Sequence, residues 1–459
     1  MSERKLRLAS ALLPEGFREN VLIEIDAKGF IGALTAGHHG SEGRLIRGIA
    51  VPGMANVHSH AHQRAMAGLA EIAGPSHDSF WTWREIMYGL ARRIGPDELE
   101  AIAAQLYVEA LKAGFTTIGE FQYLHHAPDG GPYADPAELS LRCIAAAKTA
   151  GIALTILPTL YRYGGFGKQE PQEGQRRFIN DADSYLAIVS RLADETRERE
   201  EMRLGISPHS LRAVTPELMN DVINAFNRMR PEGPIHMHVA EQKKEVEECL
   251  ARHGRRPVEF LMSHQNLTSR WCLIHATHMS DEETDRLSGS GAIAGLCPTT
   301  EANLGDGIFN APRFLENGGA FAIGSDSHIT VSVAEDLRQL EYSQRLTLNR
   351  RNVVAKGPGR STGRRLFETA SAGGAAALRQ PQGALASGLR ADIVILDEDH
   401  PSLIGRKGDA LLDSWIFSGG NGCVKEVIVA GKPVIQERRH GNEESITRRF
   451  RAALARLTG

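Results

Sequence analysis

The stretch "VPGMANVHSHAHQRAM", residues 51–66, places three histidines at alternate positions behind an apolar run. Residues 48–57 predict a strand, because β-branched and other apolar residues fit the buried surface of a sheet. His58 and His60 follow this run, and alternate residues of an extended chain point to the same face. Two buried imidazoles need partners, which a divalent metal ion would supply. His58 and His60 are therefore candidate ligands, whereas a role without chemistry is favoured for His62, because the strand should already have ended.

Further apolar runs recur along the middle of the chain, separated by amphipathic patterns typical of helices, such as residues 96–114 and 215–229. These further runs cover residues 115–121, 152–160, 202–207, 234–239, 271–276, 292–297 and 320–325. Short apolar strands that alternate with helices favour parallel βα units. Eight runs in all predict an α/β fold built on a (β/α)₈ TIM-like barrel.

The two ends of the chain have a different pattern, in which apolar and polar residues alternate around turn-like glycines. Residues 20–35 show it before the barrel, and residues 391–399 and 423–439 show it afterwards. Such alternation predicts antiparallel strands, and we expect both ends to form one small composite β-sandwich domain. The expected units are the first part of this domain, the barrel, and the second part with a terminal helix, at residues 1–50, 51–380 and 381–459.

The composition limits the class of protein and its partners. The chain has 459 residues, 42% of them hydrophobic and 24% charged, which is typical of a globular protein with a large core. A net charge of −3 gives no reason to expect nucleic acid or a membrane as a partner. Five cysteines without a CxxC pair argue against a disulfide framework and for a cytoplasmic location. We expect the chain to assemble as a homodimer.

Polar side chains follow the predicted strands, at the end where catalytic residues of such barrels gather. The positions after the first six runs and the last run are His58, His60, Glu120, Gln122, Tyr123, Tyr161, Arg162, His209, Arg212, His238, Glu241, His275, His278 and Asp326. The seventh run is followed by "PTTEANLG", residues 298–305. In a barrel these groups would converge on one mouth. Residues 162–177, rich in glycine, glutamine and charge, are the candidate exposed loop at that mouth.

Taken singly, these residues do not define a site. His236 and His238 share one face of the fifth predicted strand, and their spacing does not show which of them would bind a metal. His275 in an apolar strand could be a core histidine, and Asp326 alone would be weak evidence for a metal site. Together the groups supply nitrogen and oxygen ligands that suit Zn²⁺ or Fe²⁺.

Four short motifs resemble those of the amidohydrolase superfamily, and specifically of its mononuclear deaminase branch. They are "HSH" at 58–60, "HVAE" at 238–241, "HATH" at 275–278 and "SDSH" at 325–328. The resemblance implies one divalent metal ion, zinc or alternatively iron. The ligands that it implies are His58, His60, His238 and Asp326. His62 lies outside this set.

The same resemblance assigns the groups that transfer protons. Glu241 and His275 become the acid–base pair, and Asp326 with His275 orients the attacking water. It also favours His238 over His236 as the ligand on the fifth strand.

Lysine usage argues against a binuclear centre. Binuclear members of the superfamily bridge two metal ions with a carboxylated lysine on the fourth strand. No lysine lies between Lys168 and Lys243, so the predicted fourth strand cannot supply one. The H-x-E and PCxxC signature of the unrelated zinc deaminases is absent as well.

Within the branch, longer segments resemble the formimidoylglutamate deiminase family of histidine degradation. They are "SPHSLRAV" at 207–214, "HMHVAEQ" at 236–242 and "CPTTEANLGDG" at 297–307. That family hydrolyses N-formimino-L-glutamate to N-formyl-L-glutamate and ammonia, so the resemblance implies a small substrate with two carboxylates. The substrate-binding residues that it implies are Gln63, Arg84, Tyr123, His209 and Arg212.

The two arginines in this set suit such a substrate. Planar guanidinium groups bind carboxylates in two-pronged fashion, whereas a purine or pyrimidine has no carboxylate to match them. Arg84 lies in a helical pattern at residues 82–90, where a solvated surface charge would be equally expected. The motifs are also compatible with a related deaminase of guanine, cytosine or an adenosine derivative, and with a hydrolase that expels chloride. A metal-free barrel retained for binding or assembly is a further possibility, which the loss of one or more ligands would favour.

Overall fold

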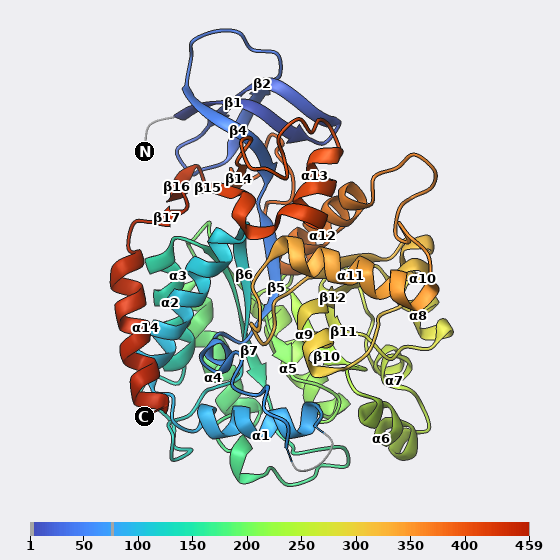
Figure 1. Cartoon of the computed structure of the whole chain (residues 1–459). Coiled ribbons are helices and arrows are strands. Elements are labelled where there is room, and N and C mark those ends of the chain that lie inside the picture. The colour runs from blue at the N-terminus through green and yellow to red at the C-terminus, as the bar shows by residue number, and fades with distance from the viewer. Residues whose placement is uncertain (1–3, 75–77, 459) are drawn as a thin grey trace.

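A computed structural model describes residues 4–74 and 78–458 of the chain. These residues form a closed parallel barrel and a second sheet beyond one end of it (Figure 1). Helix α1 (Phe80–Ala91) lies at the opposite end of the barrel (Figure 1). The predicted fold class is confirmed, since a TIM-like barrel is combined with a sheet built from both chain ends.

The barrel strands are arranged in the order in which they occur in the sequence. Within the described residues they are β5 (Met54–Ser59), β6 (Phe115–Gln122), β7 (Ala153–Leu160), β8 (Met202–Leu204), β10 (Ile235–Val239), β11 (Trp271–His275), β12 (Ile293–Leu296) and β13 (Ala320–Ile323). A short strand, β9 (Ser207–Pro208), follows β8 and also pairs with β7. A bridge from Ile206 to Ile235 connects this fourth position to β10, and β13 pairs with β5 at Asn56, so the barrel is closed.

The first apolar run differs from its prediction. One strand over residues 48–57 is wrong, because β4 (Arg44–Pro52) belongs to the second sheet and β5 begins at Met54. Gly53 lies between them, where an added Cβ atom would lie 2.3 Å from the side chain of Thr116. Glycine permits this close approach. The chain therefore passes from one sheet to the other without a linker.

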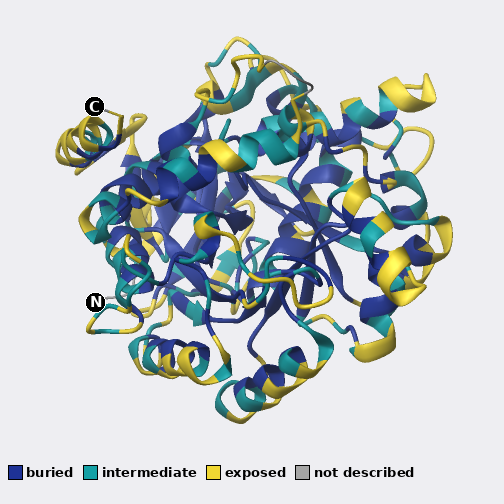
Figure 2. Cartoon of the chain, turned by 90° about the horizontal axis from the view of Figure 1, so that it is seen from below, coloured by how far each residue is buried: buried dark blue, intermediate teal, exposed yellow. Residues whose placement is uncertain are grey.

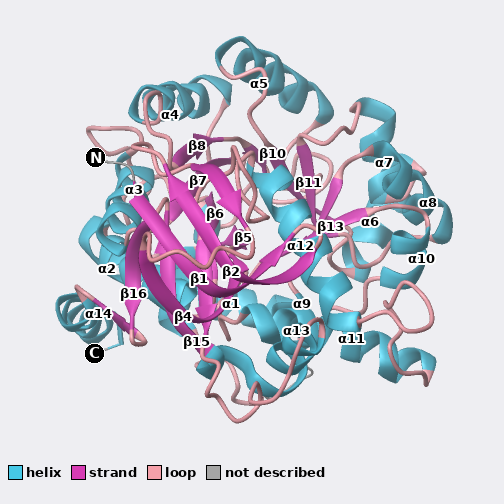
Figure 3. Cartoon of the chain, turned by 90° about the horizontal axis from the view of Figure 1, so that it is seen from above, coloured by secondary structure: helices cyan, strands magenta, loops and turns pink. Residues whose placement is uncertain are grey.

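The second sheet combines strands from both ends of the chain. Its further strands are β1 (Arg4–Leu13), β2 (Gly16–Ile25), β3 (Ile31–Thr35), β14 (Ile393–Leu396), β15 (Val424–Val429), β16 (Lys432–Gln436) and β17 (Arg439–His440). They form one continuous hydrogen-bonded sheet, seen from above in Figure 3. β4 and β14 join its two parts. Leu8 and Ile23 of the first part pack with Ile393 of the second in one buried cluster.

Helices surround the barrel, with buried inner and exposed outer faces (Figure 2). After α1 they are α2 (Pro96–Lys112), α3 (Glu138–Ala150), α4 (Ala182–Glu195), α5 (Pro216–Met229), α6 (Lys243–His253), α7 (Pro257–His264), α8 (Asp281–Ser290), α9 (Pro298–Leu304), α10 (Ala311–Glu316), α11 (Val333–Leu348), α12 (Thr362–Leu378), α13 (Ala410–Ser414) and α14 (Glu443–Thr458). α5 begins where the sequence predicts it, because the Thr215 hydroxyl accepts a hydrogen bond from the backbone N–H of Leu218. None of the described helices is long and apolar enough to cross a bilayer.

Helix α14 lies along α2 on the outside of the barrel (Figure 1). Ile446 and Leu457 on this helix are buried. The ion pairs between the two helices and their flanks are Lys112–Glu443, Glu100–Arg449 and Glu98–Arg456. The C-terminal helix therefore packs on the barrel, although the strands before it belong to the second sheet.

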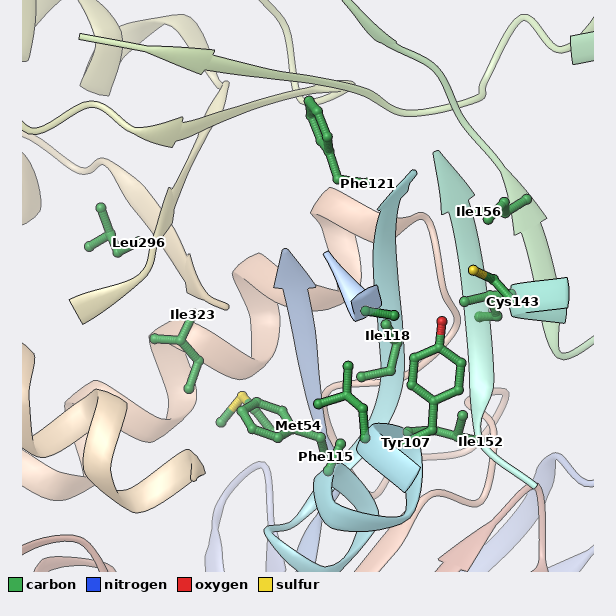
Figure 4. Close-up of a cluster of buried hydrophobic side chains, with 14 of the residues drawn as sticks. Met54, Tyr107, Phe115, Ile118, Phe121, Cys143, Ile152, Ile156, Leu296 and Ile323 are labelled. Atoms are coloured by element: carbon green, nitrogen blue, oxygen red, sulfur yellow. The ribbon is translucent and has the colours of Figure 1, made fainter. Parts of the chain in front are cut away.

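The barrel core is formed by apolar side chains of the strands and the surrounding helices (Figure 4). Met54, Phe115 and Ile118 are fully buried, and the ring of Tyr107 from α2 belongs to the same cluster. Burial of a large apolar side chain stabilises the fold by roughly 1.5–3 kcal/mol. This packing fixes the strands, and therefore the positions of the polar groups at their ends.

Candidate active site

Side chains from the ends of β5, β10 and β13 meet at one point inside the mouth of the barrel. They are His58, His60, His238 and Asp326. The Nε2 atom of His58 lies 3.1 Å from that of His60 and 3.0 Å from that of His238. Asp326 Oδ1 lies 3.5 Å from His58 Nε2 and 3.4 Å from His60 Nε2. Ligand atoms about 2.1 Å from a tetrahedral ion lie about 3.4 Å apart, so these separations fit one divalent cation.

Backbone carbonyls orient two of these histidines. Phe121 O lies 2.9 Å from Nδ1 of His60, and His209 O lies 3.1 Å from Nδ1 of His238. A carbonyl only accepts hydrogen bonds, so Nδ1 carries the proton in both rings and Nε2 presents a lone pair. Burial also holds the pKa of His58 and of His238 well below its usual range. Neutral nitrogens that converge beside a carboxylate are a suitable ligand set for a metal cation.

Glu241 and His275 lie beside this ligand cluster. His275 Nε2 is 3.9 Å from Glu241 Oε1 and 3.9 Å from Asp326 Oδ2. Burial lowers the pKa of His275, but the carboxylates of Glu241 and Glu301 outweigh this effect and raise the pKa to about 10. Burial raises the pKa of Glu241 above its usual range. Buried groups with such perturbed pKa values that face one another are candidates for an acid–base pair.

The backbone is strained at the strand ends that carry these groups. The φ angle is +51° at Ala240, +69° at His275 and +45° at Asp326. Such a conformation costs on the order of 1–3 kcal/mol for a residue with a side chain, and it persists where the surrounding structure fixes it. His275 and Asp326 are themselves members of the site, and Ala240 directly precedes Glu241. The strain therefore occurs where the chain turns to bring these side chains together.

A pocket opens onto the same groups. The lining includes all the predicted substrate-binding residues, Gln63, Arg84, Tyr123, His209 and Arg212. Trp83, Met87 and Tyr88 of α1 form part of its wall. A concave surface with aromatic walls and a few convergent polar groups is typical of a small-molecule site.

The two arginines reach the pocket from different elements. Arg84 on α1 lines the pocket with its guanidinium carbon 4.6 Å from the ring centre of Trp81, so it is not a solvated surface charge. Arg212 lies beyond β9, with Nη2 3.4 Å from Glu241 Oε2 and Nε 3.8 Å from Glu245 Oε2. Neither arginine Nε has a hydrogen-bond partner among residues 4–74 and 78–458. Buried donors of this kind are available to an anionic ligand.

Two further histidines of the predicted strand ends lie outside the cluster. The ring centre of His62 lies 4.9 Å from that of Tyr123, in an edge-on contact. His236 Nε2 donates a hydrogen bond to Ala377 O at 2.8 Å, so it is engaged by the backbone of α12. Of the two histidines on β10, the structure therefore brings His238 to the other ligands.

The predicted loop at residues 162–177 is only partly exposed. Residues 167–170 are exposed, whereas Gln175 and Arg177 are buried. Gln175 Nε2 donates a hydrogen bond to the Tyr161 hydroxyl at 2.8 Å. The loop therefore supports the pocket wall through its buried end.

Buried carboxylates without a predicted role surround the cluster. Glu120 lies near the end of β6, where it accepts hydrogen bonds from Ser59 Oγ at 2.6 Å and from Ala61 N at 2.8 Å. These contacts hold the backbone on both sides of His60. In the sequence, only its position at the end of a predicted strand marks Glu120 as a candidate site residue.

Two further carboxylates lie on helices. Glu245 is fully buried on α6, and its Oε1 accepts a hydrogen bond from Ala240 N at 3.0 Å. Glu301 is buried on α9, with Oε1 3.3 Å from Nδ1 of His275. Glu245 lies in a charged helical pattern that is typical of a solvated face, and Glu301 lies within residues 298–305, after the seventh apolar run.

The chain is similar to known proteins in both sequence and structure. The model of the amidohydrolase family matches residues 49–434. "Formimidoylglutamate deiminase" of Pseudomonas aeruginosa is 50% identical over 447 residues, which cover 97% of this chain and 98% of that protein. The crystal structure of an amidohydrolase from Brucella melitensis, 49% identical, matches with a TM-score of 0.93 over 99% of this chain and 100% of that chain. An adenosine deaminase from Xanthomonas campestris with bound zinc shares the fold, with a TM-score of 0.82 and 19% identity over 99% of this chain and 98% of that chain.

The family model covers the barrel and both of its junctions with the second sheet, and the relatives match nearly the whole chain. This chain belongs to the amidohydrolase family.

Proposed function

We propose that this chain catalyses the hydrolytic deimination of N-formimino-L-glutamate, which yields N-formyl-L-glutamate and ammonia in histidine degradation. Identity of 50% to the formimidoylglutamate deiminase of Pseudomonas aeruginosa, over nearly the whole chain, supports this function. The observation in the structure that carries it is the presence of Arg84 and Arg212 in the pocket that holds Glu241 and His275. Groups suited to binding carboxylates and groups suited to proton transfer thus line one cavity.

In this proposal the arginines bind the carboxylates of the substrate. Arg84 and Arg212 present guanidinium groups, whose planar donors match carboxylate oxygens. Gln63 Nε2 donates a hydrogen bond to the Tyr123 hydroxyl at 2.8 Å, and this pair with His209 contributes the remaining polar contacts.

The metal site of the proposal consists of His58, His60, His238 and Asp326. Imidazole nitrogens and a carboxylate oxygen suit zinc, which we propose as the ion, with iron as the alternative. When bound, the ion would lower the pKa of a water molecule and so make it a nucleophile near neutral pH. The zinc in the related adenosine deaminase structure supports this choice.

The proton transfers are assigned to the chain's own groups. His275 and Asp326, with Nε2 of the histidine 3.9 Å from Oδ2 of the aspartate, orient the attacking water, and the Asp326 carboxylate takes up its proton. Glu241 lies 3.9 Å from His275 and delivers a proton to the nitrogen that leaves as ammonia. His275 also stabilises the charge that develops in the tetrahedral intermediate.

An ammonia-release assay on protein of known metal content tests the function. N-formimino-L-glutamate should give ammonia and N-formyl-L-glutamate in equal amounts, and removal of the metal by a chelator should abolish both. Guanine, cytosine and adenosine derivatives should be poor substrates, because they lack carboxylates for the two arginines. A clear preference for one of these nucleobases would contradict the proposed substrate.

We further propose that the protein is a cytoplasmic homodimer. The described cysteines are all unpaired and buried, which a reducing compartment favours. Light scattering in solution should give about twice the mass of the 50.0 kDa chain. The mass of a single chain would contradict the dimer.

A further inference from the structure

The ring of His275 is held from behind by a carboxylate that the proposed mechanism does not use. Glu301 Oε1 lies 3.3 Å from Nδ1 of His275. The same oxygen accepts a hydrogen bond from the backbone N–H of Cys297 at 2.9 Å. His275 is 1% exposed and Glu301 is 5% exposed, so water competes little for either contact.

These contacts determine which nitrogen of the ring faces the reaction. An ionised carboxylate only accepts hydrogen bonds, so Nδ1 of His275 must carry the proton that points to Glu301. Nε2 is then the atom directed at Glu241 Oε1 and Asp326 Oδ2, each 3.9 Å away. The strained backbone at His275, with φ at +69°, places the ring at the strand end but leaves rotation about its side-chain bonds to be fixed by contacts.

We propose that Glu301 is a positioning residue for the reaction, which holds His275 with Nδ1–H toward α9 and Nε2 toward the reacting atoms. Glu301 acts through His275 and does not touch the substrate. Its backbone contact to Cys297 anchors the carboxylate, so that the ring and the first turn of α9 are fixed by one oxygen atom. The inference rests on the proposed function only for the role of Nε2.

Three substitutions at this position separate geometry from charge. Glu301→Leu removes the acceptor. Glu301→Gln keeps an oxygen that can accept from both Cys297 N–H and His275 Nδ1–H. Glu301→Asp keeps the charge but shortens the side chain by one methylene, so that the oxygen lies farther from His275. If position is what matters, the order of kcat should be wild type, Gln, Asp and Leu.

The expected loss is in kcat and not in KM. Partners of this kind, behind a group of the site, typically contribute 10- to 100-fold in activity, so kcat of Glu301→Leu should fall by roughly that factor. KM and the metal content should change little, because Glu301 is neither a proposed ligand nor a substrate contact. Glu301→Gln should recover most of kcat.

A double-mutant cycle tests whether the effect passes through His275. In a His275→Asn background, Glu301→Leu or Glu301→Asp should cause no further loss of kcat. The matched control is Glu283→Gln, since Glu283 is a buried acid, 3% exposed, that accepts from Val258 N at 3.0 Å away from the site. This control should keep the kcat of the wild type.

Two results would overturn the positioning role. One is equal kcat for the Asp and Gln variants together with a full additional loss in the His275→Asn background. The other is a loss confined to the thermal midpoint and the folded yield, with normal kcat per metal-loaded protein. If Glu301→Leu does not fold, the Asp and Gln variants decide the question. The cycle can be run on any substrate that the wild type hydrolyses, so failure of N-formimino-L-glutamate as substrate would be seen in the wild type alone.

Discussion

The mouth of the barrel and its junction with the second sheet both bury charged side chains, but they satisfy them differently. At the junction, every nitrogen of the Arg390 guanidinium donates at 2.6–3.0 Å, and the acceptors belong to Asp392, Thr117, Gln380 and Gln382. The charges there are fully bonded, although Gln382 Nε2 has no partner among the described residues. At the mouth, several buried polar atoms have no hydrogen-bond partner in the described part of the chain. They are His58 Nδ1, Gln63 Oε1, Arg84 Nε and Arg212 Nε.

This difference distinguishes burial that holds the fold from burial that serves a ligand. An unsatisfied buried polar group costs about 1–3 kcal/mol, so a cluster of them is retained only where something else completes the contacts. A fully bonded buried charge, in contrast, becomes strongly destabilising when its partner is removed. Substitutions at the mouth should therefore lower activity, whereas substitutions at the junction should lower the free energy of unfolding.

The largest loss of activity is expected from His58→Ala. Its Nε2 lies within 3.1 Å of the Nε2 atoms of both His60 and His238, so its loss opens the centre of the cluster. Elemental analysis after dialysis should show about one equivalent of metal in the wild type and almost none in the variant, with turnover lost. Two tightly held equivalents in the wild type, both needed for activity, would contradict a mononuclear site.

Arg390→Met should have the largest effect on stability. Asp392 is 1% exposed in its side chain and would be left without its cation. The free energy of unfolding in denaturant should fall by about 3–5 kcal/mol. The kcat of the folded, metal-loaded variant should stay at the value of the wild type.

The control for this variant removes both charges. Arg390→Met with Asp392→Leu leaves no unpaired ion, so it should recover part of the lost stability. A fall in kcat without a loss of stability would break the distinction between the two regions.

Glu241→Gln tests proton transfer at the mouth. The amide keeps the shape of the side chain but not its acidity, so turnover should fall by roughly 10²-fold or more. The metal content should remain at that of the wild type, because Glu241 is not a proposed ligand. Near-normal turnover with the metal in place would exclude Glu241 as the proton carrier.

The smallest loss of activity is expected from Arg212→Met. Losing a charge-assisted hydrogen bond to a substrate carboxylate should lower kcat/KM by roughly 10- to 100-fold, mainly through KM. Arg212→Lys should recover only part of this loss, since an ammonium group lacks the two-pronged geometry. An analogue without one carboxylate should impair the wild type and add little to the defect of the variant.

Glu245 provides a matched control for this arginine. Its Oε2 lies 3.8 Å from Arg212 Nε, so Arg212→Met alone also leaves a buried carboxylate without a cation. The double variant with Glu245→Gln removes that charge. If the double variant regained the kcat/KM of the wild type, the loss would come from the unpaired carboxylate and not from the substrate.

The barrel and the composite domain could be predicted because their signals are local, whereas the choice of His238 over His236 and the roles of the site residues come from the resemblance to the superfamily. Alternation over two residues places His58 and His60 on one face, and an apolar run ends just before most polar groups of the mouth, although Arg84 lies on helix α1. A capping residue such as Thr215 similarly marks the start of a helix within four residues.

What could not be predicted depends on contacts between distant segments. Glu245 looks like part of a solvated helix, and its burial is explained by two groups distant from it or outside its helix, Arg212 and the backbone N–H of Ala240. The break in the first apolar run depends on Thr116, which leaves no space for a side chain at position 53. Neither pairing leaves a periodic pattern in the sequence.

The pairing of β4 with β14 has a consequence for how the protein is made. Residues 49–52 pair with residues 393–396, so the two strands are separated in the chain by the entire barrel. During synthesis the edge of β4 stays open until the barrel has left the ribosome, and contacts so distant in sequence form slowly. An open edge is a template for pairing with other chains. A nascent or truncated chain that ends before β14 thus carries an aggregation-prone edge directly joined to the strand that bears His58.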